Sequence, residues 1–355
     1  MALKHRDKVF HTLGLLSLLF LAAALFLARR PLQSRGEMLT ASRRMKEAVA
    51  ALRDCREAAG IPIDPLRDVN RTGLIGLESS PITTSLGNLE AKRTTANPNF
   101  AGLIVLLLHQ AGVGRGETIA IGASSSFPGL IIASLCAARA MDLRPLLICS
   151  LGASQWGANQ PEFHWLEILD CLERSGLVMT GPVALSLGGD GDEGKDMSPE
   201  GRELLIRASG GTGLPFLSEP DLERNVEERL RLLETAAGEA EIRAFINVGG
   251  GYANMGTDSE ILKVTPGLAV FSRIPPRERR GMIFEMAARR VPVIHLLYIK
   301  GLCDRYGLPW DPTPLPEPGE GEFYGQKEVV PQAFLILAGV YFLLIAIVLA
   351  TAARS

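Results

Sequence analysis

Hydroxyl, amide and glycine residues gather in four segments that each follow a short apolar stretch. These segments are residues 122–129 (GASSSFPG), 151–160 (LGASQWGANQ), 188–196 (GGDGDEGKD) and 247–256 (NVGGGYANMG). Such loops can hold a carboxylate or a phosphate through hydroxyl and backbone N–H donors, and glycine lets a ligand approach the backbone closely. The candidate ligand-binding residues here are Ser126, Ser154, Asn159, Asn247, Gly249, Gly250 and Gly251.

Residues 79–93 form a fifth candidate segment. Thr83 and Thr84 precede the adjacent cations Lys92 and Arg93, and hydroxyls with charged donors suit an anionic group. The alternative is a plain charge pair on a helix face.

The serines of the first loop also allow covalent catalysis. Ser124, Ser125 or Ser126 can act as a nucleophile with His164 as its base, because His164 lies at an expected helix start beside the second loop. The stretch matches the nucleophile elbow only in part, since serine stands where the last glycine belongs. A simple helix cap at Ser126 is the alternative, and whether the protein is an enzyme stays open.

Several common chemistries lack their motifs. The chain has no GKS/T phosphate loop, no GxGxxG fingerprint and no HExxH pair. When the acidic loop 188–196 is aligned with a calcium loop, glycine stands at the fifth position (Gly194) and, beyond the loop, at the twelfth (Gly201), where ligands are needed, so a solvated turn is expected. We therefore expect neither a metal nor a cofactor.

The charge balance argues against nucleic acid as a partner. Of the 37 basic and 39 acidic residues, 31 and 38 lie within residues 31–328, so this part carries a net charge of −7. Five cysteines (55, 136, 149, 171 and 303) are dispersed without a CxxC pair. This pattern predicts free, mostly buried thiols rather than disulfides.

The two ends of the chain predict membrane helices. Residues 9–28 and 333–353 contain no Asp, Glu, Lys or Arg, and about 20 apolar residues cross a bilayer. The expected order is a basic tail (1–8), a transmembrane helix (9–28), a stalk helix (29–60), an α/β domain (61–307), a Pro-rich acidic linker (308–328) and a second transmembrane helix (329–353). A cleaved signal peptide is the alternative at the N-terminus. With two spans in the cell membrane, the lipid bilayer is an expected partner, and we place the domain outside the cytoplasm.

The central region alternates between helical and strand patterns. Strands are expected at 118–121, 145–149, 183–187, 242–248 and 293–297, and helices at 36–60, 98–111, 128–140, 161–175, 200–208, 221–237 and 276–290. Short, continuously apolar strands separated by amphipathic helices predict a mostly parallel sheet with helices on both faces. The expected fold is therefore an α/β three-layer sandwich flanked by two transmembrane helices, with the loops above at the carboxyl ends of strands, where open sheets bind ligands.

Nine short segments in order resemble the poly-gamma-glutamate system protein family over residues 65–300. They are RTGLIG (71–76), SPITT (80–84), LEAKR (89–93), SFP (126–128), SLGAS (150–154), WGA (156–158), PEF (161–163), SPEGR (198–202) and NVGGG (247–251). The resemblance implies a membrane-anchored bacterial envelope protein associated with synthesis and export of the poly-γ-glutamate capsule polymer. It assigns no catalytic residue.

Two functional classes follow. The first is an accessory component that binds the polymer, or partner membrane subunits of a poly-γ-glutamate synthase, through its strand-end loops. The alternative is a membrane-anchored serine hydrolase or transferase acting on the polymer or on a cell-envelope acyl group. A sensor of a small anionic metabolite is a third interpretation.

Overall fold

The computed structural model describes residues 2–27, 34–177, 181–325 and 331–354. The chain divides into two compact units, one made of Met1–Arg35 with Tyr324–Ser355 and the other of Gly36–Phe323. Small parts of the predicted segments lie outside the described residues. These are residue 1 of the tail, 28 of the first span, 29–33 of the stalk, 178–180 of the α/β domain, 326–328 of the linker and 329–330 of the second span.

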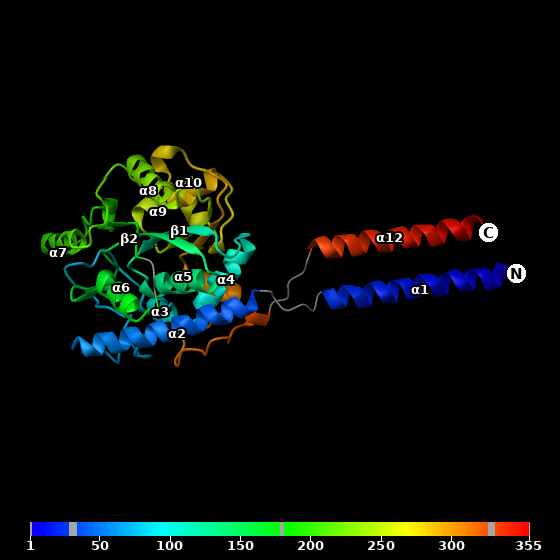
Figure 1. Ribbon diagram of the computed structural model, residues 1–355, viewed down its shortest axis with the longest axis horizontal. Helices are drawn as coiled ribbons and strands as arrows, with labels where there is room; N and C mark the ends of the chain where they lie inside the picture. Colours follow the sequence, from blue (N-terminus) through cyan, green and yellow to red (C-terminus); the bar gives the residue numbers. More distant parts are fainter. Residues whose placement is uncertain (1, 28–33, 178–180, 326–330, 355) are drawn as a thin grey trace. The chain divides into compact units, whose positions relative to one another are not determined.

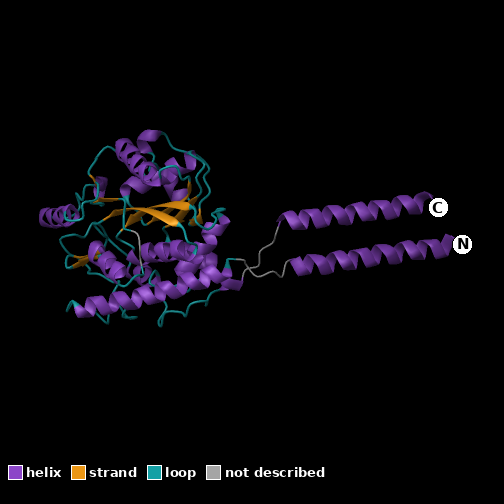
Figure 2. Ribbon diagram, viewed as in Figure 1, coloured by secondary structure: helices purple, strands orange, loops and turns teal. Residues whose placement is uncertain are grey.

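The larger unit contains a mixed α/β fold built on a seven-stranded sheet (Figures 1 and 2). Its strands, in spatial order, are β6 (Phe216–Leu217), β5 (Ala184–Ser186), β2 (Arg144–Ser150), β1 (Thr118–Ser124), β7 (Ile242–Val248), β9 (Val293–Leu296) and β8 (Gly267–Leu268). All neighbours pair in parallel except β8 with β9. The strand order reverses between β1 and β7, since the chain moves from β1 to one edge and then returns to the other side of β1.

Helices cover both faces of this sheet, as the sequence predicts. In Figure 1, α8 (Leu222–Ala237), α9 (Tyr252–Met255) and α10 (Met282–Ala288) lie above it. On the other face are α3 (Leu89–Thr94), α4 (Asn99–Gln110), α5 (Pro128–Ala140) and α6 (Trp165–Arg174), while α7 (Pro199–Gly210) lies at the left side of this unit. The central strands are buried on both sides, which explains why they read as continuous apolar runs.

The structure adds elements that the sequence patterns did not predict. They include the edge strands β6 and β8, helices α3, α9 and α11 (Ile299–Tyr306), and a small hairpin of β3 (Asn159–Gln160) and β4 (Phe163–His164). The helix expected over 161–175 consequently begins at Trp165. The helix expected over 276–290 is a 3-10 turn, Arg277–Arg279, followed by α10.

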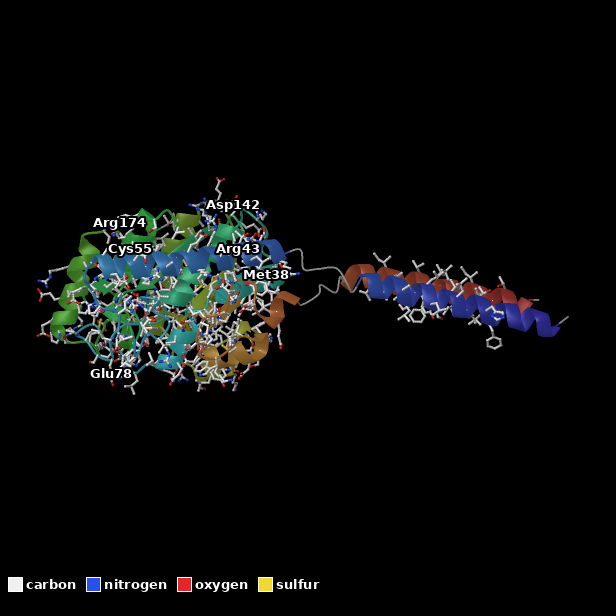
Figure 3. The ribbon with its side chains drawn as sticks, turned by 90° about the horizontal axis from the view of Figure 1, so that it is seen from below. Met38, Arg43, Cys55, Glu78, Asp142 and Arg174 are labelled. Carbon is white, nitrogen blue, oxygen red and sulfur yellow. A yellow bond between two sulfur atoms is a disulfide. The ribbon has the colours of Figure 1, made fainter. Side chains whose placement is uncertain are left out.

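The stalk prediction is wrong for helix α2 (Arg35–Ala58). Most of this helix belongs to the α/β unit, and Met38, Ala41, Met45 and Leu52 are fully buried. Figure 3 shows α2 lying across this unit, with Met38, Arg43 and Cys55 labelled along it. Its apolar stripe, which the sequence already contained, is therefore a packing face rather than a feature of a free helix.

The proline-rich segment is not a solvated spacer either. Asp311 forms a bidentate ion pair with Arg93, and Asn99 donates to the carbonyl of Glu317 and accepts from the amide of Gly319. Phe323 is fully buried. Because proline segments keep their carbonyls free, this strap can lie on the domain and accept hydrogen bonds from its helices.

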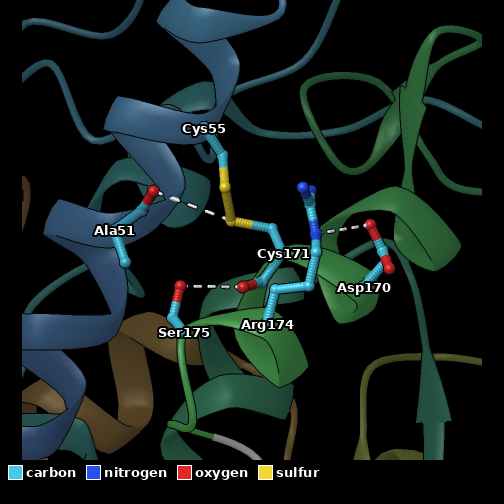
Figure 4. The surroundings of a disulfide bond; sticks show 6 residues. All are labelled: Ala51, Cys55, Asp170, Cys171, Arg174 and Ser175. Carbon is cyan, nitrogen blue, oxygen red and sulfur yellow. Dashed lines mark hydrogen bonds and ion pairs between the residues drawn. A yellow bond between two sulfur atoms is a disulfide. The ribbon is translucent and has the colours of Figure 1, made fainter.

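The cysteine prediction is also wrong for two of the five residues. Cys55 on α2 and Cys171 on α6 form a disulfide across 116 residues of sequence, shown in Figure 4. Cys136, Cys149 and Cys303 are free and buried. The sequence alone does not predict this disulfide, because only the packing of α2 against α6 brings the two sulfurs together.

The smaller unit consists of two helices that pack against each other. Helix α1 (Ala2–Leu27) contacts α12 (Pro331–Arg354), with the ring of Phe20 stacked 4.4 Å from that of Tyr341. The hydroxyls of Ser17 and Tyr341 lie 2.9 Å apart. Among the described residues, a search for helices with the length and apolar character of a membrane crossing finds none.

Candidate functional site

All four predicted loops, and residues 79–93, contribute to one cavity of about 610 Å³. Ser124 ends β1, and Ser126 and Phe127 follow it; Ser154 follows β2, Gly189 follows β5 and Gly250 to Tyr252 follow β7. The cavity therefore lies at the carboxyl ends of the strands, beside the β1–β7 position where the strand order reverses. This is the usual ligand position in open parallel sheets. Its volume is within the ~300–1,000 Å³ typical of small-molecule sites.

Lys92 is the central charged residue of this cavity. It comes from α3, only 4% of its surface is exposed, and its Nζ donates to the Ser154 Oγ at 2.8 Å and to the Ser126 carbonyl at 2.5 Å. The ammonium also lies 3.6 Å from the centre of the Phe127 ring. Among the described residues, no carboxylate forms an ion pair with it. Burial lowers the pKa of Lys92 to about 7, because a charged amine loses its hydration there.

A chain of hydroxyls lies beside Lys92. Ser126 Oγ accepts hydrogen bonds from Ser124 Oγ and from the backbone N–H of Ser154, each at 2.9 Å. A hydroxyl has two acceptor positions and one donor, so Ser126 keeps its own O–H for another partner. Thr84 completes the polar wall. The predicted residues Ser124, Ser126, Ser154, Thr84 and Lys92 thus come together at one site.

The glycine-rich loop after β7 forms the opposite wall. Gly249 has a φ of +79°, a conformation that favours glycine, while Gly250 and Gly251 line the cavity. Asn247 is fully buried below them and donates to the Gly249 carbonyl at 2.8 Å, with its amide also 3.0 Å from His295 Nδ1. Asn247 therefore shapes the loop and does not line the cavity, contrary to its predicted role.

Four other candidates are placed away from the cavity. Arg93, although adjacent to Lys92, points to Asp311, because successive helical side chains project about 100° apart. Asn159 holds the backbone of Leu77 and donates to the Thr83 hydroxyl, which also binds the Ser80 amide. Ser125 is fully buried and donates to the Ser150 carbonyl. Arg93, Asn159, Thr83 and Ser125 therefore position the loops.

His164 is also outside the cavity. Its Nδ1 accepts from the Leu166 amide and lies 2.8 Å from the Glu167 carboxylate, while Glu167 accepts from the His164 amide. This is a reciprocal cap of helix α6. The imidazole ring of His164 therefore caps helix α6, and the predicted pairing of His164 with a serine of residues 124–126 is not present.

The acidic loop is a solvated turn only in part, since Asp190, Lys195 and Asp196 are exposed but Asp192 is not. Asp192 is buried and forms an ion pair with Arg229 of α8 at 2.5 Å, and Ser186 and Asn225 also bind its carboxylate. Asp196 of the same loop lines the cavity, and burial raises the pKa of its carboxyl group. Among the described residues, no group of three or more His, Cys, Asp or Glu is arranged to hold a metal ion.

Comparison of the chain with protein-family models, with curated proteins and with solved structures finds no match. The central feature of the site is a buried amine that is hydrogen-bonded to a serine hydroxyl at a strand-end cavity. The pairing of Lys92 with Ser154 was not predicted, because 62 residues of sequence separate the two.

Proposed function

We propose that this protein is a membrane-anchored cell-envelope protein that binds a carboxylate-bearing ligand in the strand-end cavity, as a component of a poly-γ-glutamate synthesis or export system. The observation that carries the proposal is the convergence of Lys92 and four hydroxyls on one cavity of about 610 Å³. Hydroxyl and cationic donors are suited to carboxylates. The link to poly-γ-glutamate comes from the nine sequence segments, six of which contribute residues to the cavity or to the loops around it.

The cavity suits a short ligand better than a long stretch of polymer. Its volume fits a small molecule or the end of a chain, and the net charge of −7 on residues 31–328 opposes binding of a polyanion over a broad surface. We therefore propose recognition of one or a few γ-glutamyl units. Partner subunits of a synthase complex would then bind any longer stretch of the polymer.

Two observations support a membrane location with the domain outside the cytoplasm. Residues 9–28 and 333–353 lack Asp, Glu, Lys and Arg, and apolar side chains of α1 and α12 such as Leu18 and Ile336 are exposed. The disulfide between Cys55 and Cys171 supports an oxidising compartment, since cytosolic thiols are normally kept reduced.

The test uses a host that carries only the poly-γ-glutamate synthase subunits. The full chain is added, and the amount and length of polymer are measured in cells and in medium. We expect a changed amount or location of polymer, and this change should be lost with Gly251→Val. A Cβ added at Gly251 meets no atom within 4 Å, and Gly251 lines the cavity, so valine there is expected to narrow the cavity.

Gly210→Val is the matched control. Gly210 also has no atom within 4 Å of an added Cβ, but it lies at the end of α7, away from the cavity. It should behave as the unmodified chain does. An unchanged polymer in the presence of the protein, or equal effects of the two valine variants, would contradict the proposal.

A further inference from the structure

The Lys92–Ser154 pair has the geometry of a nucleophile with its base. Ser154 and Lys92 both line the cavity, and the Lys92 Nζ lies 2.8 Å from the Ser154 Oγ. This distance is within the range over which a base removes a proton from a hydroxyl. The pair is not on the surface, because 6% of Ser154 and 4% of Lys92 are exposed.

The surroundings of Lys92 suit both of its protonation states. As an ammonium, it has three N–H groups for the Ser154 Oγ, the Ser126 carbonyl and the face of the Phe127 ring. As a neutral amine, it keeps two N–H groups for the carbonyl and the ring, and its lone pair can accept the proton of Ser154. The remaining titratable side chains that line the cavity are Asp196 and Tyr252, and the lowered pKa of Lys92 arises from burial alone.

An amine of this kind is an effective base near neutral pH. A lysine with an ordinary pKa near 10.4 is almost fully protonated at pH 7 and cannot take a proton. With its pKa lowered to about 7, about half of Lys92 is neutral at that pH. Desolvated lysines serve as general bases in enzymes for this reason.

We propose that Ser154 and Lys92 form a catalytic nucleophile–base pair for acyl transfer from an amide or ester bound in the strand-end cavity. The inference rests on the cavity being the ligand site of the proposed function, but it does not require poly-γ-glutamate as the ligand. If that polymer is the substrate, the bond cleaved is a γ-glutamyl amide.

The reaction has two steps, acylation of Ser154 and hydrolysis of the resulting ester. The Ser154 Oγ attacks the carbonyl carbon of a substrate amide while Lys92 takes the hydroxyl proton of Ser154. The C–N bond of the amide then breaks, and the leaving amine receives this proton from Lys92. An acyl ester remains on Ser154. Water then attacks the ester, Lys92 takes a proton from it and returns a proton to Ser154 Oγ. The products are a carboxylic acid and an amine. The free O–H of Ser126 is the donor placed beside the nucleophile for the developing oxyanion.

The test uses the full chain and an alkyl fluorophosphonate, which reacts with an activated serine by forming a P–O bond and releasing fluoride. The labelled residue is mapped by mass spectrometry. We expect one adduct, on Ser154, with a labelling rate that rises with pH around 7 as Lys92 loses its proton. Lys92→Met should slow labelling about 10²–10⁴-fold, the usual contribution of a general base.

Matched variants separate catalysis from general damage. Lys46→Met removes an exposed lysine and Ser218→Ala an exposed serine, and both should label at the rate of the unmodified chain. If Lys92→Met does not fold, Lys92→Arg provides a second variant, since arginine stays charged at all relevant pH values. Site mapping and the pH profile of the unmodified chain need no variant.

The outcomes distinguish this inference from the proposed function. No adduct, an adduct on another serine, or a rate independent of Lys92 would overturn the nucleophile–base pair even if the protein alters poly-γ-glutamate in the host. Labelling of Ser154 that depends on Lys92, without any effect on the polymer, would support the pair and refute the proposed polymer.

Discussion

Loss of the Cys55–Cys171 disulfide should destabilise the α/β unit strongly. The bond joins α2 to α6 across 116 residues, so the unfolded chain gains a large amount of freedom when it is cut. The loop-entropy relation gives about 16 cal/mol/K for a closed loop of that length, or about 5 kcal/mol at 25 °C. With ~2.1 cal/mol/K of unfolding entropy per residue over residues 36–323, this corresponds to a decrease of about 8 °C in the melting temperature.

Unfolding of the full chain in urea measures this effect. Tryptophan fluorescence reports on the α/β unit alone, because Trp156, Trp165 and Trp310 all belong to it. The Cys55→Ser/Cys171→Ser variant should unfold at a lower urea concentration than the oxidised chain. Reductant should bring the unmodified chain close to the variant and leave the variant unchanged.

Cys303→Ser is the control, since this thiol is free and its replacement opens no loop. It should remain sensitive to reductant in the same way as the unmodified chain. The predicted stabilisation by the disulfide would be refuted if the oxidised chain, with the Cys55–Cys171 link verified by mass spectrometry, unfolded at the same urea concentration with and without reductant.

Three further predictions concern charged groups. The pKa of Lys92 falls from 10.5 in the unfolded chain to about 7 in the fold, so the unfolded state binds more protons than the folded state between these pH values. The free energy of unfolding should therefore rise by roughly 2 kcal/mol from pH 7 to 9. Lys92→Met should remove this slope in urea titrations at the two pH values. Asp192→Ala should cost about 3–5 kcal/mol in the same assay, because Arg229 would be left buried without its carboxylate, and Arg229→Met in that background should recover part of the loss. Arg93→Gln should lower the free energy of unfolding by about 1–3 kcal/mol, because the ion pair with Asp311 is lost. The affinity for γ-glutamate oligomers, measured by calorimetry, should not change. Weakened binding would mean that Arg93 belongs to the site.

The sequence was sufficient for the arrangement of the main secondary structure. The helix at Pro128–Ala140 and the strand at Ile242–Val248 have the predicted limits, because a proline in the first helical turn and a continuous apolar run act within a few residues of chain. The same local signals placed the glycine- and serine-rich loops after parallel strands, and general rules for such sheets then indicated the edge where ligands bind.

The partners of individual side chains were decided only by the tertiary structure. Adjacent Lys92 and Arg93 enter different environments, and His164 caps a helix rather than serving a serine. Lys92 meets Ser154 because the chain before α3 pairs with the loop after β2, through a β-bridge between Thr83 and Ala153. Hydrogen bonds, ion pairs and disulfides require contact within a few ångströms, and the distance between two residues along the chain does not specify their distance in the fold.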